Sequence, residues 1–222
     1  MPIVVTTSGP ISTVSPDITF SGLITLIGKY LARGDVASLV PNWITQAEDV
    51  LNYGMDPMPP LRCREMEVET TVDMTDGAGT LPEDFLEAKY FKDSASNRLP
   101  LSFITQDEAQ RRFSSGAGGA SVDYTVVGET VYAYPISTGT FNLVFFQRIP
   151  ALSDAQPSNW LLEKNHAIYL HLVLSIGFDY LRNPQETAKH LQAAVSLVNG
   201  MNKSQMVSQY GRSSLTMRGP AP

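Results

Sequence analysis

The chain has 222 residues with a single cysteine, and 43% of its residues are hydrophobic while 17% are charged. This composition indicates a globular protein with one sizeable core, and it excludes a disordered chain and a disulfide-based scaffold. The net charge of −6 argues against a general nucleic-acid binder, which normally carries a basic surplus. We find no apolar run of the roughly 20 residues that a membrane span requires, and no signal-peptide pattern at the N-terminus.

Charge is distributed unevenly along the chain. Residues 203–222 contain three basic residues and no acidic one, so this segment carries +3 and residues 1–202 carry −9 of the total of −6. The segment holds too little apolar sequence to form a core of its own. We interpret it as a C-terminal arm that is either disordered or ordered by a neighbouring chain. Its candidate contact residues are Tyr210, Arg212, Leu215, Met217 and Arg218.

The first third of the chain is predicted to be an extended arm followed by helices. Residues 1–18 form the arm, and apolar residues then recur with helical spacing over 23–31 and again from Pro41 to Gly54. The expected capping residues of the first helix are Thr19 or Ser21 at its start and Gly34, in a left-handed conformation, after its end.

A β-rich part is expected from residue 64 to residue 154. Apolar and polar residues alternate over 64–74, which is typical of a half-buried strand. The clearest hairpin surrounds Gly128-Glu129, since glycine at the first turn position favours a type II′ turn. We predict a small antiparallel sheet in which residues 140–148 add a third strand to this hairpin. The other expected features are a turn at 76–79, extended segments at 85–92 and 99–104, a short helix capped by Thr105 and a flexible loop at 114–121.

Helical periodicity returns at Asn159. Residues 167–181 are apolar on nearly every side, as in a helix buried in a bundle. Asn183-Pro184 then begins a last helix, which Asn199-Gly200 is expected to end. Its predicted buried stripe contains Ala188, Leu191, Val195 and Val198.

This order of elements predicts an α+β fold, in which a helical bundle formed by the N- and C-terminal halves carries an inserted antiparallel β-rich module. The expected parts are an extended arm at 1–18, the bundle at 19–63 and 155–202, the insertion at 64–154 and the C-terminal arm at 203–222. The predicted bundle core contains Leu23, Ile27, Trp43, Ile44, Trp160, Leu170, Leu174 and Leu191.

Catalytic, metal and cofactor motifs are not evident. His166 and His171 lie about 140° apart on a helix and so do not share a face. Cys63 has a cation on each side but no histidine nearby in sequence, and a chance free thiol is the preferred interpretation. A tail-associated peptidoglycan hydrolase remains an alternative, with a carboxylate pair as its acid and base. Its candidate residues are Glu65, Glu67, Glu69, Asp73, Glu83 and Asp84.

Three stretches, in this order, resemble the head-to-tail adaptor (connector) proteins of tailed bacteriophages and gene-transfer particles. Their order and spacing carry the resemblance, which covers about residues 20–200. The sequence departs from the family pattern at Lys164-Asn165-His166, where similar proteins often have a proline and an acid, and this affects the start of a helix. The three stretches are 39–52 with 64–67 downstream, Leu81-Pro82-Glu83-Asp84-Phe85-Leu86-Glu87, and 124–128 through 148–154 to 159–162.

The resemblance implies a structural virion protein without enzymatic activity or cofactor. Such proteins form a ring, usually of twelve copies, that joins the portal to a tail or nozzle protein, and DNA passes through the lumen without specific binding. The resemblance implies that the bundle forms the ring wall, that the β-rich part faces the tail and that the C-terminal arm binds the portal. The chain is expected in the virion neck, and in the host cytoplasm before assembly. Another neck ring, such as a stopper or tail-completion protein, remains an alternative.

Overall fold

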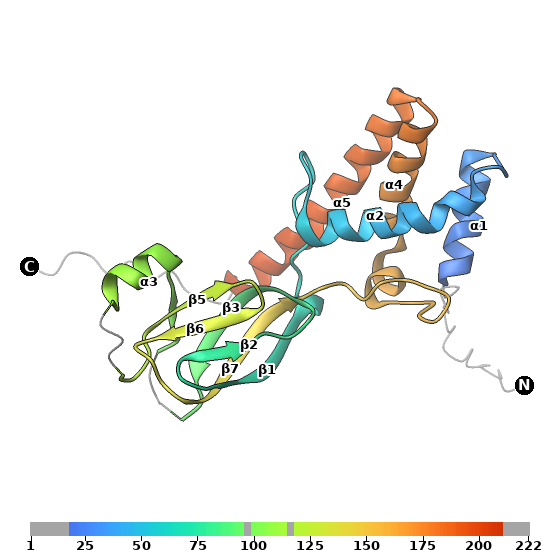
Figure 1. The fold of residues 1–222 in the computed structure, drawn as a ribbon. Helices are drawn as coiled ribbons and strands as arrows, with labels where there is room; N and C mark the ends of the chain where they lie inside the picture. Colours follow the sequence, from blue (N-terminus) through green and yellow to red (C-terminus); the bar gives the residue numbers. More distant parts are fainter. Residues whose placement is uncertain (1–17, 96–98, 115–117, 211–222) are drawn as a thin grey trace, which may run out of the picture. The chain divides into compact units, whose positions relative to one another are not determined.

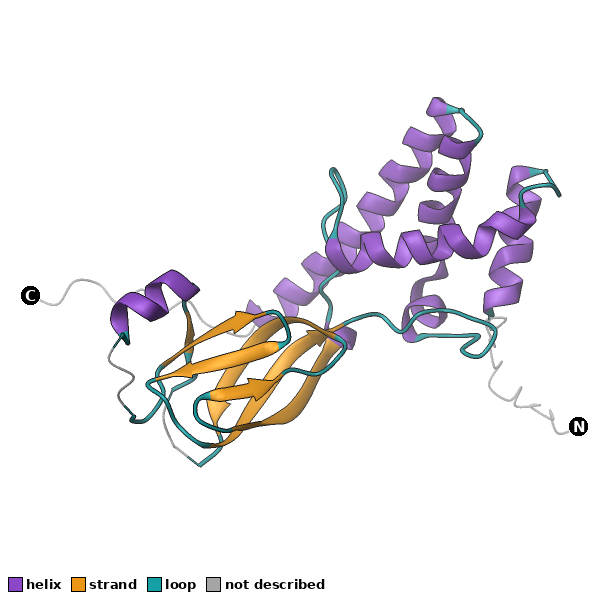
Figure 2. Ribbon diagram, in the orientation of Figure 1, coloured by secondary structure: helices purple, strands orange, loops and turns teal. Residues whose placement is uncertain are grey.

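The computed structural model describes residues 18–95, 99–114 and 118–210, and the side chains of 205–210 are not included in the description. These residues form a mixed α+β fold with five α-helices and two β-sheets, which confirms the predicted α+β class (Figures 1 and 2). The chain divides into two compact units. The helical unit contains residues up to Ala47 together with Ala151–Ala194, and the β-containing unit contains Glu48–Pro150 together with Val195 onward.

The helical unit is built from α1 (Phe20–Leu31), the first part of α2 (Val40–Tyr53), α4 (Trp160–Tyr180) and the first part of α5 (Pro184–Tyr210). A 3-10 turn, η1 (Ala37–Leu39), precedes α2. Leu23, Ile27 and Leu31 of α1 are buried because residues four apart lie on one helix face, and this face packs against α4.

The caps of α1 are only partly those predicted. Thr19 is the N-cap, and its Oγ1 accepts a hydrogen bond of 3.2 Å from the Gly22 amide, as expected. The prediction that Gly34 is the left-handed residue after the helix is wrong. The chain leaves the helix at Ala32, which has a φ of 53°, so the reversal occurs two residues earlier than the glycine suggested.

Six of the eight residues predicted for the bundle core are buried, whereas Trp160 and Leu191 are partly exposed. At the start of α4 the fully buried positions are the next two residues, Leu161 and Leu162. In α5 the predicted stripe is offset, since Ala188 is exposed while His190, Ala194 and Val198 are buried. The buried six are Leu23, Ile27, Trp43, Ile44, Leu170 and Leu174.

Helix α4 is interrupted within its first two turns. Asn159 caps it by accepting a hydrogen bond of 2.9 Å from the Leu162 amide, and its Nδ2 donates to the Tyr169 hydroxyl at 2.8 Å. Asn165 has non-helical angles, φ −150° and ψ 65°, and therefore breaks the helix. The break falls within Lys164-Asn165-His166, the three residues at which the sequence departs from the adaptor pattern.

The predicted end of the last helix is wrong. Helix α5 continues through Asn199-Gly200 to Tyr210. A Cβ at Gly200 would meet no atom within 4 Å, so the glycine serves neither a tight turn nor a close approach there. The side chain that holds this part of the helix in place is Asn202, whose contacts are described below.

The β-containing unit has two sheets rather than the one predicted. One sheet has the strand order β1-β7-β3, and the other has the order β2-β6-β5-β4. The correction concerns strand partners: β7 pairs antiparallel with β1 and β3 instead of extending the β5–β6 hairpin, and β4 pairs parallel with β5. Alternation along a strand indicates which residues share a face but not which strand lies alongside. The elements are η2 (Arg64–Met66), β1 (Glu67–Met74), β2 (Ala78–Thr80), β3 (Phe85–Asp93), β4 (Ser102–Phe103), α3 (Gln106–Arg112), β5 (Asp123–Val127), β6 (Thr130–Tyr134) and β7 (Gly139–Gln147).

Two turns in this unit depend on positive φ angles. Gly128 has a φ of 61° and Val127 pairs with Thr130, as expected for a two-residue hairpin loop with glycine first. The turn predicted at 76–79 is shorter than expected, because only Asp76 (φ 50°) and Gly77 (φ 76°) turn the chain while the next two residues already belong to β2.

A buried cluster contains residues of both sheets, so the sheets pack face to face. Its strand residues include Val72 and Met74 of β1, Phe91 of β3, Tyr124 of β5, Val131 and Ala133 of β6, and Phe141, Leu143 and Phe145 of β7. Phe91 stacks on Phe141, with ring centroids 5.1 Å apart.

Alanine at two glycines is expected to change the free energy of unfolding in opposite directions. A Cβ at Gly79 would lie 2.5 Å from Met74 Sδ and 2.7 Å from Val72 Cγ1, so Gly79→Ala is expected to destabilise the protein by about 2 kcal/mol. A Cβ at Gly28, inside α1, would meet nothing within 4 Å, and Gly28→Ala should stabilise by up to about 1 kcal/mol. Urea unfolding of both variants measures the two effects, and equal effects of the same sign would contradict the packing described.

Candidate interaction surfaces

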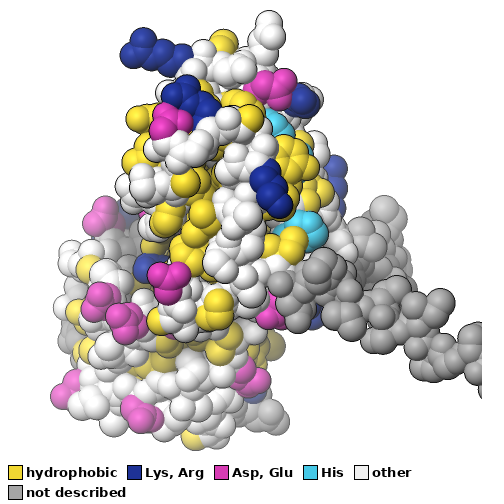
Figure 3. All heavy atoms as spheres, turned by 90° about the vertical axis from the view of Figure 1, so that its right-hand side faces the viewer, with side chains coloured by type: hydrophobic (Ala, Val, Ile, Leu, Met, Phe, Trp, Pro, Cys, Tyr) yellow, Lys and Arg dark blue, Asp and Glu magenta, His cyan; other side chains and the backbone are white. Residues whose placement is uncertain are grey.

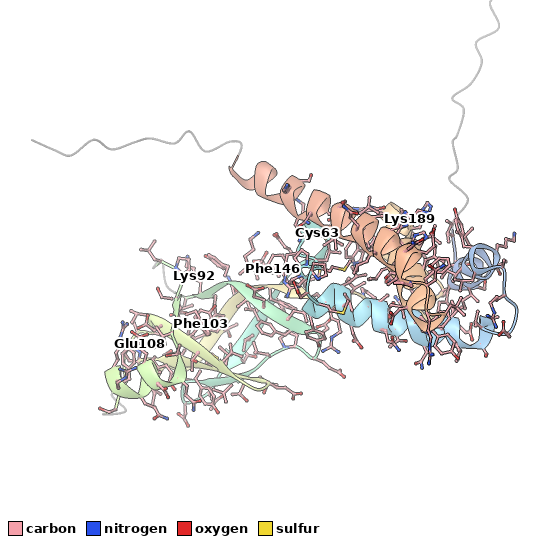
Figure 4. All side chains as sticks on the ribbon, turned by 90° about the horizontal axis from the view of Figure 1, so that it is seen from above. Cys63, Lys92, Phe103, Glu108, Phe146 and Lys189 are labelled. Carbon is pink, nitrogen blue, oxygen red and sulfur yellow. The ribbon has the colours of Figure 1, made fainter. Side chains whose placement is uncertain are left out.

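The environment of Cys63 does not favour a nucleophilic thiol. The residue is buried, and burial raises the pKa of its thiol to about 12, with a further contribution from the charge of Glu65. The pKa of this thiol is thus raised although Arg62 and Arg64 flank it in sequence. Figure 4 shows Cys63 on the segment between α2 and β1.

Three of the six candidate carboxylates make hydrogen bonds with side chains of β3 or β7. Glu67 accepts a hydrogen bond of 2.6 Å from Lys89 Nζ on β3, and Asp73 accepts one of 2.7 Å from Thr140 Oγ1 on β7. Asp84 accepts from the side-chain amide of Gln147. Within the described residues, no three histidine, cysteine or acidic side chains form a group that could hold a metal ion.

Two of the three histidines meet in the helical unit. His171 of α4 and His190 of α5 place their Nδ1 atoms 2.9 Å apart, so one neutral imidazole donates a hydrogen bond to the other. Phe178 stacks on His190 with a centroid distance of 5.4 Å. Burial lowers the pKa of both rings, the charge of Lys189 adds to the effect on each, and Glu186 opposes it at His190.

The histidine pair predicts a loss of stability on acidification. Both folded pKa values lie below the ordinary value of 6.5, so the unfolded chain binds protons more readily and the free energy of unfolding should fall as pH drops from about 7.5 to about 5.5. His171→Gln should weaken this dependence, because it removes one titrating group and keeps a hydrogen-bonding side chain. His166→Gln, at an exposed position, is the matched control. Identical pH profiles for wild type and His171→Gln in thermal unfolding would contradict the prediction.

The second part of α5 is fixed to the β-containing unit by Asn202. Its Nδ2 donates a hydrogen bond of 3.0 Å to the Pro60 carbonyl, and its Oδ1 accepts one of 2.9 Å from the Arg62 amide. One amide side chain thus holds the backbone of the segment that follows α2. We call these contacts the arm base, because Asn202 immediately precedes residues 203–222.

Arg62 extends the arm base into the sheet. Its Nη1 donates to the carbonyls of Asn52 at 3.0 Å and Leu61 at 2.8 Å, while its Nε donates to Glu87 Oε2 on β3 at 3.1 Å. The guanidinium also lies over the ring of Phe146, 5.7 Å from its centroid. The buried Asn52 side chain accepts in turn from the Ile149 amide at 3.0 Å. The arm base is therefore a connected polar network in which the Asn202 and Arg62 side chains each make more than one contact.

The arm base was not predicted from the sequence. One signal was present: Ala194, Val198 and Asn202 are spaced four residues apart, so Asn202 continues the buried stripe of α5 beyond Gly200. Of the predicted arm residues, Tyr210 is the last residue of α5. Arg212, Leu215, Met217 and Arg218 lie outside the described residues.

Several large apolar side chains are exposed on each unit. In the helical unit, Tyr30 is 55% exposed and Tyr180 is 59% exposed, although Tyr180 also contacts the Trp43 ring. Figure 3 shows apolar side chains gathered between scattered charged ones on one face of this unit. In the β-containing unit, the exposed residues include Leu99, Phe103 and Val122 at and around the short strand β4. Surfaces of this kind are typical of protein contacts.

In the β-containing unit, a groove of about 380 Å³ includes the exposed Phe103 in its lining. We call it the edge groove. Its walls are mostly apolar, and its one charged residue, Glu87, is the residue that pairs with Arg62. It is lined by Phe85, Leu86, Glu87, Ala88, Phe103, Tyr124 and Val126.

Taken together, the described residues present contact surfaces and a helix anchored beside a basic C-terminal segment, which are features of a protein that assembles with others. Their helices include none that is long and apolar enough to cross a membrane. No curated protein matches the chain closely.

The family model described as SU10 adaptor protein matches residues 18–218, and the chain belongs to this family. It is accordingly a phage head-to-tail adaptor, a structural phage protein, and the resemblance noted in the sequence is confirmed. Membership of this family implies a location in the neck of the virion.

Proposed function

We propose that copies of this chain, usually twelve, form a ring that joins the portal to a tail or nozzle protein. In this ring residues 19–63 and 155–202 form the wall, residues 64–154 face the tail and residues 203–222 bind the portal. The observation that carries the proposal is that the family match reaches residue 218, and so includes most of the C-terminal arm. The anchoring of α5 at Asn202, directly before the arm, supports the same assignment.

Charge supports a lumen through which DNA passes without being held. Residues 1–202 carry −9, and a surface with this excess of acid repels a phosphate backbone. The basic arm then has the opposite charge from the rest of the chain, which suits a separate contact with another protein.

Assembly of the full chain on portal rings tests the proposal. Portal rings mixed with the chain should acquire an additional closed ring in negative-stain images, with its copy number readable from class averages. The chain should retain little double-stranded DNA at physiological salt in the same preparation. A chain that binds a tail component and ignores portal rings would instead be a stopper or tail-completion protein.

A further inference from the structure

The edge groove has the form of a site for an added β-strand. Phe85, Leu86, Glu87 and Ala88 are consecutive residues of β3, and all four line it. A groove that is lined by four consecutive residues follows the direction of β3, which is an edge strand of its sheet. Tyr124 and Val126 of β5 are two residues apart, and β5 therefore contributes one face. Figure 4 labels Phe103, the β4 residue of the lining.

Each sheet contributes an edge strand to the groove. β3 is the last strand of the sheet β1-β7-β3, and β4 is the last strand of the other sheet and only two residues long. Phe85, Ala88 and Val126 are partly buried residues that pack against the core cluster, so the groove opens onto the edge of that core. An inserted strand would cover apolar surface and pair with the β3 backbone at once.

The length of this edge favours a short strand. β3 shifts register against β7 between Phe85 and Glu87 and again between Ala88 and Tyr90. Such irregularities twist an edge and prevent long regular pairing. A run of about five residues, roughly 17 Å long when extended, is enough to span the four β3 residues that line the groove.

One segment outside the described residues has the matching sequence. Ile3-Val4-Val5-Thr6-Thr7 is a run of five β-branched residues, bounded by Pro2 on one side and by Ser8-Gly9-Pro10 on the other. No charged side chain occurs before Asp17, so the segment enters an apolar groove without desolvating a charge. The other terminal segment would bring Arg212 and Arg218, and the single acid of the groove is already paired with Arg62.

We infer that residues 3–7 of a second copy of this chain add as a strand to the edge of β3 in the edge groove. The contact would link neighbouring copies through backbone hydrogen bonds, with the apolar side chains of the segment covering the core edge. This inference depends on the proposed function in one respect, namely that the neighbouring chain in the ring is a second copy of this chain.

Cross-linking between full-length chains tests whether residues 3–7 occupy the edge groove and whether they come from a second copy. Val5→Cys chains and Ala88→Cys chains are mixed and treated with a short bismaleimide, and linked peptides are identified by mass spectrometry. We expect a cross-link between position 5 of one chain and position 88 of another. Its yield should be several-fold above that from a mixture of Val5→Cys and Glu129→Cys chains. The native Cys63 is buried and remains in every variant. A 5–88 link found only within one chain, or a stronger link from Leu215→Cys to position 88, would overturn the inference.

Hydrogen exchange supplies a second measurement that does not depend on cross-linker geometry. Val5→Pro removes a strand hydrogen bond, so amide exchange over 85–88 should become several-fold faster than in Val5→Ala. Equal exchange in the two variants, together with the absence of a specific link, would disprove strand addition. If strand addition is disproved in this way but the unsubstituted chain still forms rings on the portal, only this inference fails. If those rings never form, the proposed function fails whatever the links show.

Discussion

A chain that ends at Tyr210 is expected to bind portal rings at least about tenfold more weakly than the full chain while keeping its fold. The truncation removes Arg212, Leu215, Met217 and Arg218, which are the charged and large apolar residues assigned to the portal contact. A tenfold loss corresponds to about 1.4 kcal/mol, a modest value for two charged and two apolar contacts. Biolayer interferometry on immobilised portal rings measures the change in Kd.

The end point of this truncation matters because of the arm base. A chain cut at Gly200 would also lose Asn202 and its two hydrogen bonds, so weaker binding would not distinguish a missing arm from a damaged helix. Arg212→Gln with Arg218→Gln tests charge alone and should reduce the salt dependence of binding. Lys29→Gln, at an exposed cation of α1 outside residues 203–222, is the matched control. Undiminished binding by the chain that ends at Tyr210 would refute the role of the arm.

Asn202→Ala is expected to lower the free energy of unfolding by about 3 kcal/mol. The substitution removes two hydrogen bonds and leaves the Pro60 carbonyl and the Arg62 amide without their side-chain partner, in a part-buried place. The cost should exceed that of a typical surface change because Arg62 is also held by Asn52 and Glu87. Urea unfolding followed by circular dichroism gives the value.

The neighbouring residue provides the control for this prediction. Lys203 is exposed, and Lys203→Ala should change the free energy of unfolding by less than about 0.5 kcal/mol. Asn202→Asp keeps an acceptor for the Arg62 amide and loses the donor to Pro60, so it should fall between wild type and Asn202→Ala. If all three variants unfold at the same urea concentration, the arm base does not hold α5 in the way described.

Local chemistry was the most predictable part of this fold. Thr19, one of two candidates, and Thr105 cap their helices as expected because each accepts a hydrogen bond from an amide three residues ahead. Gly128 likewise has the positive φ that its hairpin turn requires. Interactions of this kind depend on a few neighbouring residues, so the sequence contains all the information that determines them.

Long-range partners were not predictable in the same way. β7 was expected beside the hairpin that precedes it, yet it lies between β1 and β3. Asn199-Gly200 is a good local signal for the end of a helix, but the hydrogen bonds of Asn202 with Pro60 and Arg62 involve residues about 140 positions away and α5 continues. Both errors arise because contacts between distant segments outweigh preferences of order 1 kcal/mol.

The burial of Cys63 has a consequence for the ageing of the assembled particle. Because burial raises the pKa of this thiol to about 12, little thiolate forms at neutral pH, and the thiolate is the form that oxidants attack. We therefore expect Cys63 to resist disulfide formation and oxidation to sulfenic acid outside a reducing cell.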